Sequence, residues 1–294
     1  MFVGSALIPR FSLLAAVGDR SGMLTEPAAV APQPGGEQRV GEVSGAAEAF
    51  GIRPGMPVSE ALGRCPRLAL LAPDPGRAAA EWERIVRNLE GIGASVESNR
   101  VGEAFFAIDG LRSIWGPRRE DVLIRAGRAI GLPARIAGAP TRFCAYAAAS
   151  TAGSRRRRAP RVIGAGRERD FLAPLPVSLL DGRLQIEDGE TGGRLVGTLE
   201  RLGVRTLGDL AGLPRVAIAD RFGGLGLRAR GLACGEDTPL RPRRPHEELV
   251  QAIGLPEAAY GIQLVRALDL LIERVLADPR RAERAIRSLR LEAR

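Results

Sequence analysis

Apolar and polar residues alternate along the first 111 positions with periods typical of both strands and helices. Residues 3–8 form a short apolar run ending at Pro9, which predicts a buried strand. Between residues 82 and 89 the apolar positions follow helical spacing, so we expect a helix over residues 76–91. Residues 95–111 then alternate on both sides of a glycine-containing bend, which indicates two strands joined as a hairpin.

The pattern continues with a helix, a strand and a second helix, expected over residues 117–130, 132–139 and 143–149. Strand, helix, hairpin, helix and strand in this order predict a ferredoxin-like arrangement, with one sheet and its helices on one face. The expected fold class is therefore α+β.

Shorter elements are expected between the first strand and the helix at 76–91. Residues 20–45 are rich in Gly, Pro, Ala and Gln, which indicates a loop, with short strands around Val30 and Val43. Two helices joined by a turn at Gly51–Gly55 follow, and a short strand comes after them at 68–73.

The second half is predicted to be mostly helical. Four consecutive arginines (Arg155, Arg156, Arg157 and Arg158) mark a junction, and short helices broken by Gly and Pro follow from 171 to 240. Residues 241–246 resemble a linker, and a last helix is expected at about 256–277. The final residues, RSLRLEAR, alternate like the start of a strand. Because one strand cannot form a sheet, the C-terminal domain is expected to be cut short.

Charge separates the two parts of the chain. The net charge is +9 and every basic residue is arginine. Residues 1–100 hold 10 Arg against 11 acids, whereas residues 101–294 hold 33 Arg against 23 acids. A basic region beside a neutral one favours a polyanionic partner such as nucleic acid. The alternative is an arginine-rich genome that codes for a solvated surface.

Several classes of protein are disfavoured by the remaining composition. The three cysteines are widely spaced, which argues against a disulfide framework or a zinc knuckle, and the only histidine, His246, lies in the predicted linker. The apolar opening could pass for a signal peptide, but Pro9 and Arg10 interrupt it. No apolar run is long enough to span a membrane. A cytoplasmic protein without membrane partners is expected.

LERLGVRTLGDLAGLP, residues 199–214, has the pattern of a helix-hairpin-helix. Gly203 can end the first helix, and Thr206 with Asp209 has the spacing of a capping box for the second. The backbone amides of the turn (Gly203, Val204, Arg205 and Thr206) are predicted to face a DNA phosphate, with the charge of Arg205 beside them. The four arginines at 155–158 are predicted DNA contacts as well. The alternative is an ordinary packing turn between two helices.

Five motifs in order resemble a Y-family (UmuC/DinB-like) translesion DNA polymerase. They are FGIRPGMPVSEALGRCP, VESNRVGEAFFAIDGL, ARIAGAPTRFCAYAAAS, FLAPLPVSLL and LERLGVRTLGDLAGLP. The resemblance implies a ferredoxin-like palm sheet, small helical fingers, a helical thumb with a helix-hairpin-helix and a partial little finger. Its implied boundaries are palm at 1–19 and 75–162, fingers at 20–74, thumb at 163–240, and linker with truncated little finger at 241–294.

The same resemblance implies that the catalytic positions have lost their chemistry. Family members hold two Mg²⁺ ions between a first-strand Asp and a carboxylate pair on the hairpin. Here Leu7 stands at the first-strand position, Pro9 at a neighbouring acidic position and Gly102 at the first position of the pair, which leaves Glu103 as a remnant. One carboxylate is a poor magnesium cage. No intact metal site is therefore expected.

The triphosphate contacts are missing as well. Glu48 stands where the family has a fingers arginine, and Tyr146 stands where it has a palm lysine. This pattern resembles the ImuB-like branch, whose members are thought to act as adaptors in damage-induced (SOS) mutagenesis. Partners implied by the resemblance are DNA, a RecA-related accessory protein, a replicative-type polymerase and the sliding clamp, although the clamp-binding tail is absent here. QLVRALDLL (263–271) is interpreted as a core helix rather than a clamp motif.

Three functions remain open from the sequence. The first is a non-catalytic, DNA-binding adaptor in DNA repair and translesion synthesis, without a cofactor. The second is a poorly processive, error-prone DNA polymerase that needs Mg²⁺. The third is a gene fragment without function.

Overall fold

A computed structural model describes residues 1–18, 20–152, 160–184, 192–243, 249–256 and 259–279, together with Leu289 and Leu291. The chain divides into two units, residues 1–244 and 245–294, and each is described by itself. The junction at 155–158, His246 and most of the last eight residues lie outside the described parts of the chain.

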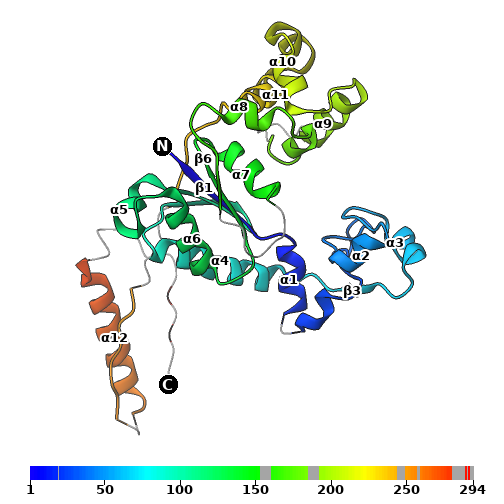
Figure 1. Cartoon of the computed structure of the whole chain (residues 1–294). Coiled ribbons are helices and arrows are strands. Elements are labelled where there is room, and N and C mark those ends of the chain that lie inside the picture. The colour runs from blue at the N-terminus through cyan, green and yellow to red at the C-terminus, as the bar shows by residue number, and fades with distance from the viewer. Residues whose placement is uncertain are drawn as a thin grey trace. The chain divides into compact units, whose positions relative to one another are not determined.

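A five-stranded sheet organises the first unit, with strand order β4-β5-β1-β6-β7 (Figure 1). Its strands are β1 (Val3–Leu7), β4 (Val96–Arg100), β5 (Glu103–Ala107), β6 (Arg135–Ala139) and β7 (Arg161–Val162). The first four strands are antiparallel to their neighbours, while β7 runs parallel to β6. The hairpin β4–β5 sits beside β1 and not in sequence order, which is the ferredoxin-like topology that the sequence predicts.

Helices cover both faces of this sheet. α4 (Pro75–Gly91) and α6 (Arg119–Ile130) share an apolar cluster with Ala6, Ala104 and Phe106. α7 (Arg142–Ser150) packs with Ala137 and Ala139, which point to the opposite face because side chains alternate along a strand. The expectation of helices on one face was therefore wrong. α7 is rich in alanine and faces small sheet residues, which allows the helix to approach the sheet closely.

The helix start and the apolar spacing that predict α4 are both seen as contacts in the structure. The Asp74 side chain accepts a hydrogen bond from the Arg77 amide at 2.8 Å, and Pro75 occupies the first turn. Four apolar residues at helical spacing are buried against the sheet: Trp82, Ile85, Val86 and Leu89. The predicted helix at 76–91 is confirmed.

Two short elements, η2 (Asp109–Leu111) and α5 (Arg112–Trp115), connect the hairpin to α6.

A small unit within residues 20–74 follows α1 (Phe11–Val17). It contains η1 (Ser21–Leu24), β2 (Ala28–Val30), α2 (Gly45–Ala49), α3 (Val58–Arg64) and β3 (Ala69–Leu71), with β2 parallel to β3. Ile52 and Ala47 lie at the centre of its core. Gly51 and Gly55 both have positive φ, so the predicted helix–turn–helix forms where glycine permits it.

Helices dominate the described part of residues 163–240, called here the helical region, where the sequence predicts short helices from 171 to 240. They are α8 (Glu168–Leu172), η3 (Val177–Leu180), α9 (Gly192–Arg201), α10 (Leu207–Gly212) and α11 (Arg215–Ala233), the last with a break at Gly223. Leu172, Leu180 and Leu199 belong to the same apolar cluster as the alanines of α7. The helical region is thus packed on the α7 face of the sheet.

The second unit contains α12 (Ile262–Ala277), which begins six residues later than the helix expected from 256. Leu264 and Leu268 are 48% and 40% exposed, and Ala267 is the buried residue of the helix. The interpretation of 263–271 as core is therefore not met by the described part of this unit. Across the described residues, no helix has the length and apolar character to cross a membrane.

Candidate functional site

The positions singled out by the family resemblance meet at one end of the sheet. Leu7, the last residue of β1, is paired directly with Glu103, the first residue of β5. The Ile8 amide donates to the Gly102 carbonyl at 2.8 Å, and Pro9 begins the turn into α1. Residues 7, 9, 102 and 103 therefore share one site, although only one of them carries a carboxylate.

Gly102 is fixed as glycine by its backbone. Its φ is +82°, a conformation that residues with a Cβ adopt only with strain. A Cβ added here would lie 2.8 Å from the Phe11 Cβ and 3.1 Å from the Ile8 carbonyl oxygen. The turn is thus built around the absence of a side chain, and an acid at position 102 would require the hairpin to change.

Arg183 holds the remaining acid. Both oxygens of Glu103 accept hydrogen bonds from the two terminal nitrogens of the Arg183 guanidinium, a bidentate ion pair. The two side chains are only 10% and 15% exposed. Arg183 lies just after η3, 80 residues from Glu103, so no local spacing in the sequence could predict the pair.

Tyr146 lies on the other side of the same guanidinium. The Arg183 guanidinium carbon lies 3.5 Å from the centre of the Tyr146 ring, a cation–π contact. Burial by itself would lower the pKa of Arg183, but the hydrogen bonds and charge of Glu103, with smaller contributions from Tyr146, raise that pKa above its usual value. Arg183 is therefore a permanent cation between the two residues expected to mark the degenerate metal and triphosphate positions.

These residues do not fit a magnesium ion. Magnesium needs near-octahedral oxygen ligands, and both carboxylate oxygens of Glu103 are bound to a guanidinium. In the described parts of the chain, no group of three or more His, Cys, Asp or Glu side chains is placed to hold a metal ion.

Glu48 also has an internal partner. Its carboxylate binds the Arg10 guanidinium, with 2.5 Å between Oε2 and Nη2. Arg10 precedes α1 with φ +59°, the one positive φ among the non-glycine residues that the structure describes. This left-handed conformation is uncommon outside glycine. An acid thus stands at the position where the resemblance predicts a triphosphate-binding arginine, and the pair joins α2 to the turn between β1 and α1.

The turn after α9 has no free amides to offer a phosphate. The amides of Gly203 and Val204 donate to the Glu200 and Leu199 carbonyls, each at 3.0 Å. Those of Arg205 and Thr206 donate to the Asp209 carboxylate at 3.1 Å and 2.9 Å. These bonds, with the one from the Thr206 amide foremost, lower the pKa of Asp209. The capping box is confirmed, but the same aspartate occupies the place predicted for the anion.

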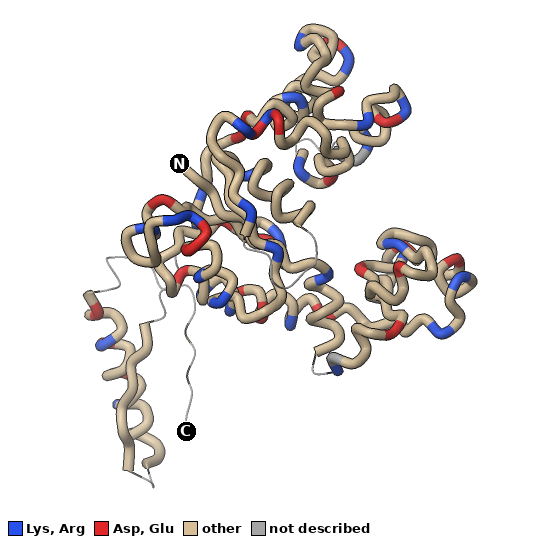
Figure 2. Tube along the Cα trace, in the orientation of Figure 1, with Lys and Arg blue, Asp and Glu red and all other residues tan. Residues whose placement is uncertain are grey.

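Arginine side chains remain available beside this turn. Arg205 is exposed, and a hollow on α9 is lined by Arg194, Gly197, Thr198 and Arg201. The Arg201 guanidinium donates to the Thr198 hydroxyl at 3.1 Å. Positions 194, 197, 198 and 201 share one helix face, a spacing that is present in the sequence but was not among the predicted DNA contacts. Figure 2 shows that arginine positions continue along the helices of this region.

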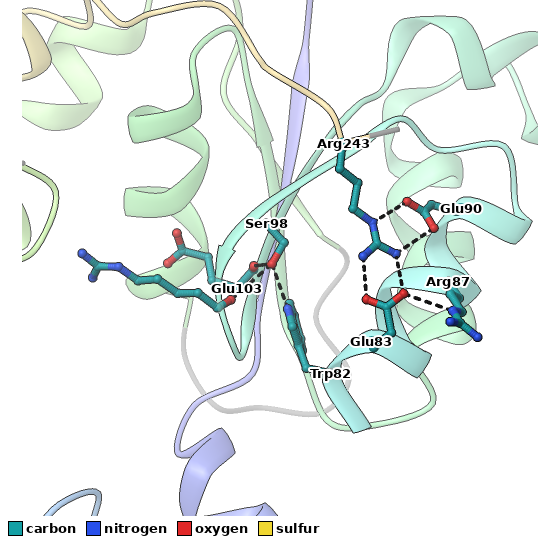
Figure 3. A network of polar contacts seen from close by, with 8 residues as sticks. Trp82, Glu83, Arg87, Glu90, Ser98, Glu103 and Arg243 are labelled. Atoms are coloured by element: carbon teal, nitrogen blue, oxygen red, sulfur yellow. Dashed lines mark hydrogen bonds and ion pairs between the residues drawn. The ribbon is translucent and has the colours of Figure 1, made fainter. Parts of the chain in front are cut away.

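The chain that leaves α11 is fastened along the outer edge of the sheet. Asp237 accepts from the Phe143 amide at 2.8 Å, and the Arg243 amide donates to the Val96 carbonyl of β4 at 2.8 Å. The Arg243 guanidinium binds Glu83 and Glu90 of α4 at 2.6–3.0 Å (Figure 3). Residues 237–243, named here the edge segment, therefore bind α7, α4 and one backbone carbonyl of the edge strand β4.

Figure 3 also shows how the hairpin is tied to α4. The Trp82 indole donates to the Ser98 hydroxyl at 2.8 Å, and that hydroxyl donates to the Glu103 carbonyl at 2.9 Å. The Trp82 ring packs edge-on against Phe11, with 5.2 Å between centroids. The backbone of Glu103 is thus positioned through α4, while its carboxylate is held by Arg183.

Replacing Arg243 by alanine is expected to weaken the edge segment in a pH-dependent way. The hydrogen bond from Arg243 lowers the pKa of the Glu83 carboxyl below its usual value. A lowered pKa stabilises the fold above about pH 4.5, and that stabilisation is lost as pH falls through the folded-state value. Arg243→Ala should lower Tm by roughly 2–4 °C at pH 7, and the difference should shrink below pH 4.

Thermal unfolding of both proteins between pH 3.5 and 7.5 measures this difference. Arg128→Ala, on the exposed side of α6, is the matched control and should give a difference that does not vary with pH. A Tm difference for Arg243→Ala that persists undiminished at pH 3.5 would rule out the carboxylate pair as its cause.

Comparisons with known proteins agree with this architecture. A profile described as the impB/mucB/samB family (IMS) matches residues 8–150. "DNA polymerase IV" of Caulobacter vibrioides is 30% identical over 192 residues, which are 64% of this chain and 45% of the relative. "DNA polymerase IV 2" of Mesorhizobium japonicum is 28% identical over 254 residues, 84% of this chain and 59% of the relative. The chain spans about half the length of these relatives.

Solved structures share the fold at low sequence identity. A structure titled "Insertion ternary complex of Dbh DNA polymerase" has a TM-score of 0.66 at 17% identity and covers 82% of this chain and 69% of its own. The structure of DinB from Sulfolobus solfataricus has a TM-score of 0.61 at 17% identity, covering 81% and 69%. With the strand order above, these findings place residues 8–150 in the impB/mucB/samB (UmuC/DinB-like) family and show that the chain shares the fold of solved Y-family DNA polymerases.

Proposed function

We propose that this chain is a DNA-binding Y-family homologue in translesion synthesis that does not transfer nucleotides itself. The observation that carries the proposal is the bidentate pair of Glu103 and Arg183. A guanidinium occupies the carboxylate that a divalent ion would need, and no second acid stands at Leu7 or Gly102. The central sheet, residues 20–74 and residues 163–240 correspond in this proposal to palm, fingers and thumb.

An adaptor role follows as the finer part of the proposal. A protein that keeps the fold and a DNA-binding region but cannot catalyse the reaction can still position other proteins on DNA. By resemblance to the ImuB-like branch, the partners would be a replicative-type polymerase, a RecA-related accessory protein and the sliding clamp. An active error-prone polymerase is the second candidate, favoured by the similarity to relatives named DNA polymerase IV.

DNA is proposed to bind the helical region through arginine side chains. The amides of the 203–206 turn are occupied within the chain, so the phosphate contacts fall to Arg205 and to the arginines of the α9 hollow. Contacts of this kind position a duplex without reading its sequence. Arg155–Arg158 stay in the proposal as predicted DNA contacts outside the described residues.

Binding to primer–template DNA is expected to weaken steeply with salt. Each phosphate neutralised by arginine releases a counterion, so log K should fall linearly with log salt concentration. Arg205→Glu should weaken binding alike for all sequences and reduce the slope by about 1. Fluorescence anisotropy measures the affinity and its salt slope at several salt concentrations from about 50 to about 200 mM. In this range, phosphate contacts dominate the change in affinity.

Arg128→Glu supplies the control, because it makes the same charge change on α6, across the sheet from α7. It should alter the slope less than Arg205→Glu does. An affinity that is indifferent to salt, or equal effects of the two substitutions, would remove the helical region as the DNA-binding surface.

A further inference from the structure

The β4–β5 hairpin and the segment that follows η3 each contribute one arginine that binds the other. Arg183 donates to the Glu103 carboxylate, and Arg100 donates in return to the Gly182 carbonyl. Residues 181–184 therefore lie against the hairpin at the end of the sheet where positions 7, 102 and 103 meet. One contact is a buried ion pair and the other is a charged hydrogen bond to backbone.

Each side of this junction is firmly attached to a different part of the unit. Leu180 and Leu184, which flank residues 181–183, are buried in the cluster that contains Leu199 and Leu207 of the helical region. On the other side, β5 pairs along its whole length with β1, and the Glu103 backbone is held through Ser98. A contact between these two parts can thus restrain the helical region relative to the hairpin.

Burial makes the two charges depend on each other. Glu103 is 7% exposed, and the guanidinium of Arg183 lies over the Tyr146 ring. Removing one partner of a buried pair leaves the other charge desolvated and uncompensated. Removing both charges avoids that penalty, so the double substitution should be less harmful than the sum of the single ones.

We propose that Glu103, Arg183 and Arg100 form a latch that fixes the helical region on the β4–β5 hairpin, so that DNA binding depends on Glu103 but not on a metal ion. The DNA-binding half rests on the proposed function. The remaining acid of the family's metal site is a positioning residue here. It acts through Arg183 on the region that carries the α9 arginines.

The latch is tested first without DNA. Glu103→Gln and Arg183→Met should each lower Tm by about 5–15 °C and speed amide hydrogen exchange in η3 and α10. The combined Glu103→Gln/Arg183→Met protein should have a higher Tm than the sum of the single losses predicts. Arg100→Ala exposes no buried charge, so it is the milder variant, and it should speed exchange in η3 with a smaller Tm change. Arg128→Ala is the control.

Metal and DNA provide the remaining measurements. Addition of Mg²⁺ or of a chelator should leave the Tm of the unaltered protein unchanged, and Glu103→Gln should weaken DNA binding by about 5-fold or more at fixed salt, a loss of about 1 kcal/mol. Unchanged exchange in η3 for all three variants, additive single effects, or a Tm raised by Mg²⁺ would overturn the latch. Faster exchange with unaltered DNA affinity would overturn its coupling to binding. If the unaltered protein binds no DNA at all, the proposed function fails, while exchange and Tm still decide the latch.

Discussion

Primer extension by this chain is expected to give no nucleotide incorporation, with either Mg²⁺ or Mn²⁺. In two-metal phosphoryl transfer, metal ions stabilise the charge of the transition state by several kcal/mol, which is on the order of 10³-fold or more in rate. The only acid retained at the predicted metal positions is Glu103, and its oxygens are bound to Arg183. Glu48, which faces Arg10, supplies no positive charge for a triphosphate.

Excess protein, all four nucleotides and a labelled primer–template make the assay sensitive to slow incorporation. The Caulobacter vibrioides DNA polymerase IV relative, assayed in parallel, shows that the substrate is competent. A contaminating polymerase is distinguished by Glu103→Ala, which would not affect it. Incorporation that survives purification and disappears in Glu103→Ala would establish the polymerase alternative and end the adaptor proposal.

Both acids at the predicted metal and triphosphate positions have partners within the chain. Glu103 has Arg183, and Glu48 has Arg10. A site losing its chemistry without further selection on the fold would leave buried charges without partners, which is costly. Here Glu103, the remaining acid, is paired with Arg183 of the segment after η3, and Glu48 of α2 is paired with Arg10 in the turn after β1. This pairing supports a retained function for the folded chain over a gene fragment without one.

Periodicity predicted the parts of the fold in which it is strong. α4 and the β4–β5 hairpin carry clear helical and alternating patterns, and the order of elements was enough for the ferredoxin-like topology. The placement of α7 was wrong because its sequence, RFCAYAAAS, is small and apolar on several sides. Such a helix gives no direction for its buried face, so its position opposite α4 and α6 depends on tertiary packing alone.

The sequence predicted which positions lie together at the site, but not which side chains bind one another there. Positions 7, 102 and 103 come together as the resemblance implies, yet Arg183 pairs with Glu103 across 80 residues, which no spacing in the sequence encodes. The capping box at Thr206 and Asp209 was predicted correctly, but the bonds from the Arg205 and Thr206 amides to Asp209 were not predicted. An aspartate that caps a helix at this spacing takes up the turn's own amides, so they are not open to phosphate.

Restoring acids at two positions, Leu7→Asp with Gly102→Asp, is expected to destabilise the protein and leave it inactive. An aspartate at 102 has to adopt φ +82° and meets the Phe11 Cβ at 2.8 Å, a strain of about 1–3 kcal/mol before any repacking. An aspartate at 7 replaces a partly buried leucine directly opposite Glu103, which costs several kcal/mol more in desolvation and repulsion. Calorimetry in chelator should show a Tm lower than that of the unaltered protein.

The Arg183 guanidinium competes with a metal ion for the new carboxylates. A guanidinium already lies at Glu103, and an aspartate introduced at position 7 would be opposite Glu103 and close to the same cation, which competes with a metal ion for both acids. We therefore expect the double variant to show no Mn²⁺ binding by electron paramagnetic resonance and no primer extension. Adding Arg183→Met to the double variant should allow Mn²⁺ to bind. The single variant Arg183→Met has only one carboxylate at the site, so it should not bind Mn²⁺. Incorporation still requires triphosphate contacts, so Glu48→Arg and Tyr146→Lys should be necessary as well. Robust extension by the double variant alone would show that the triphosphate positions are assigned wrongly and that Arg183 does not exclude the metal.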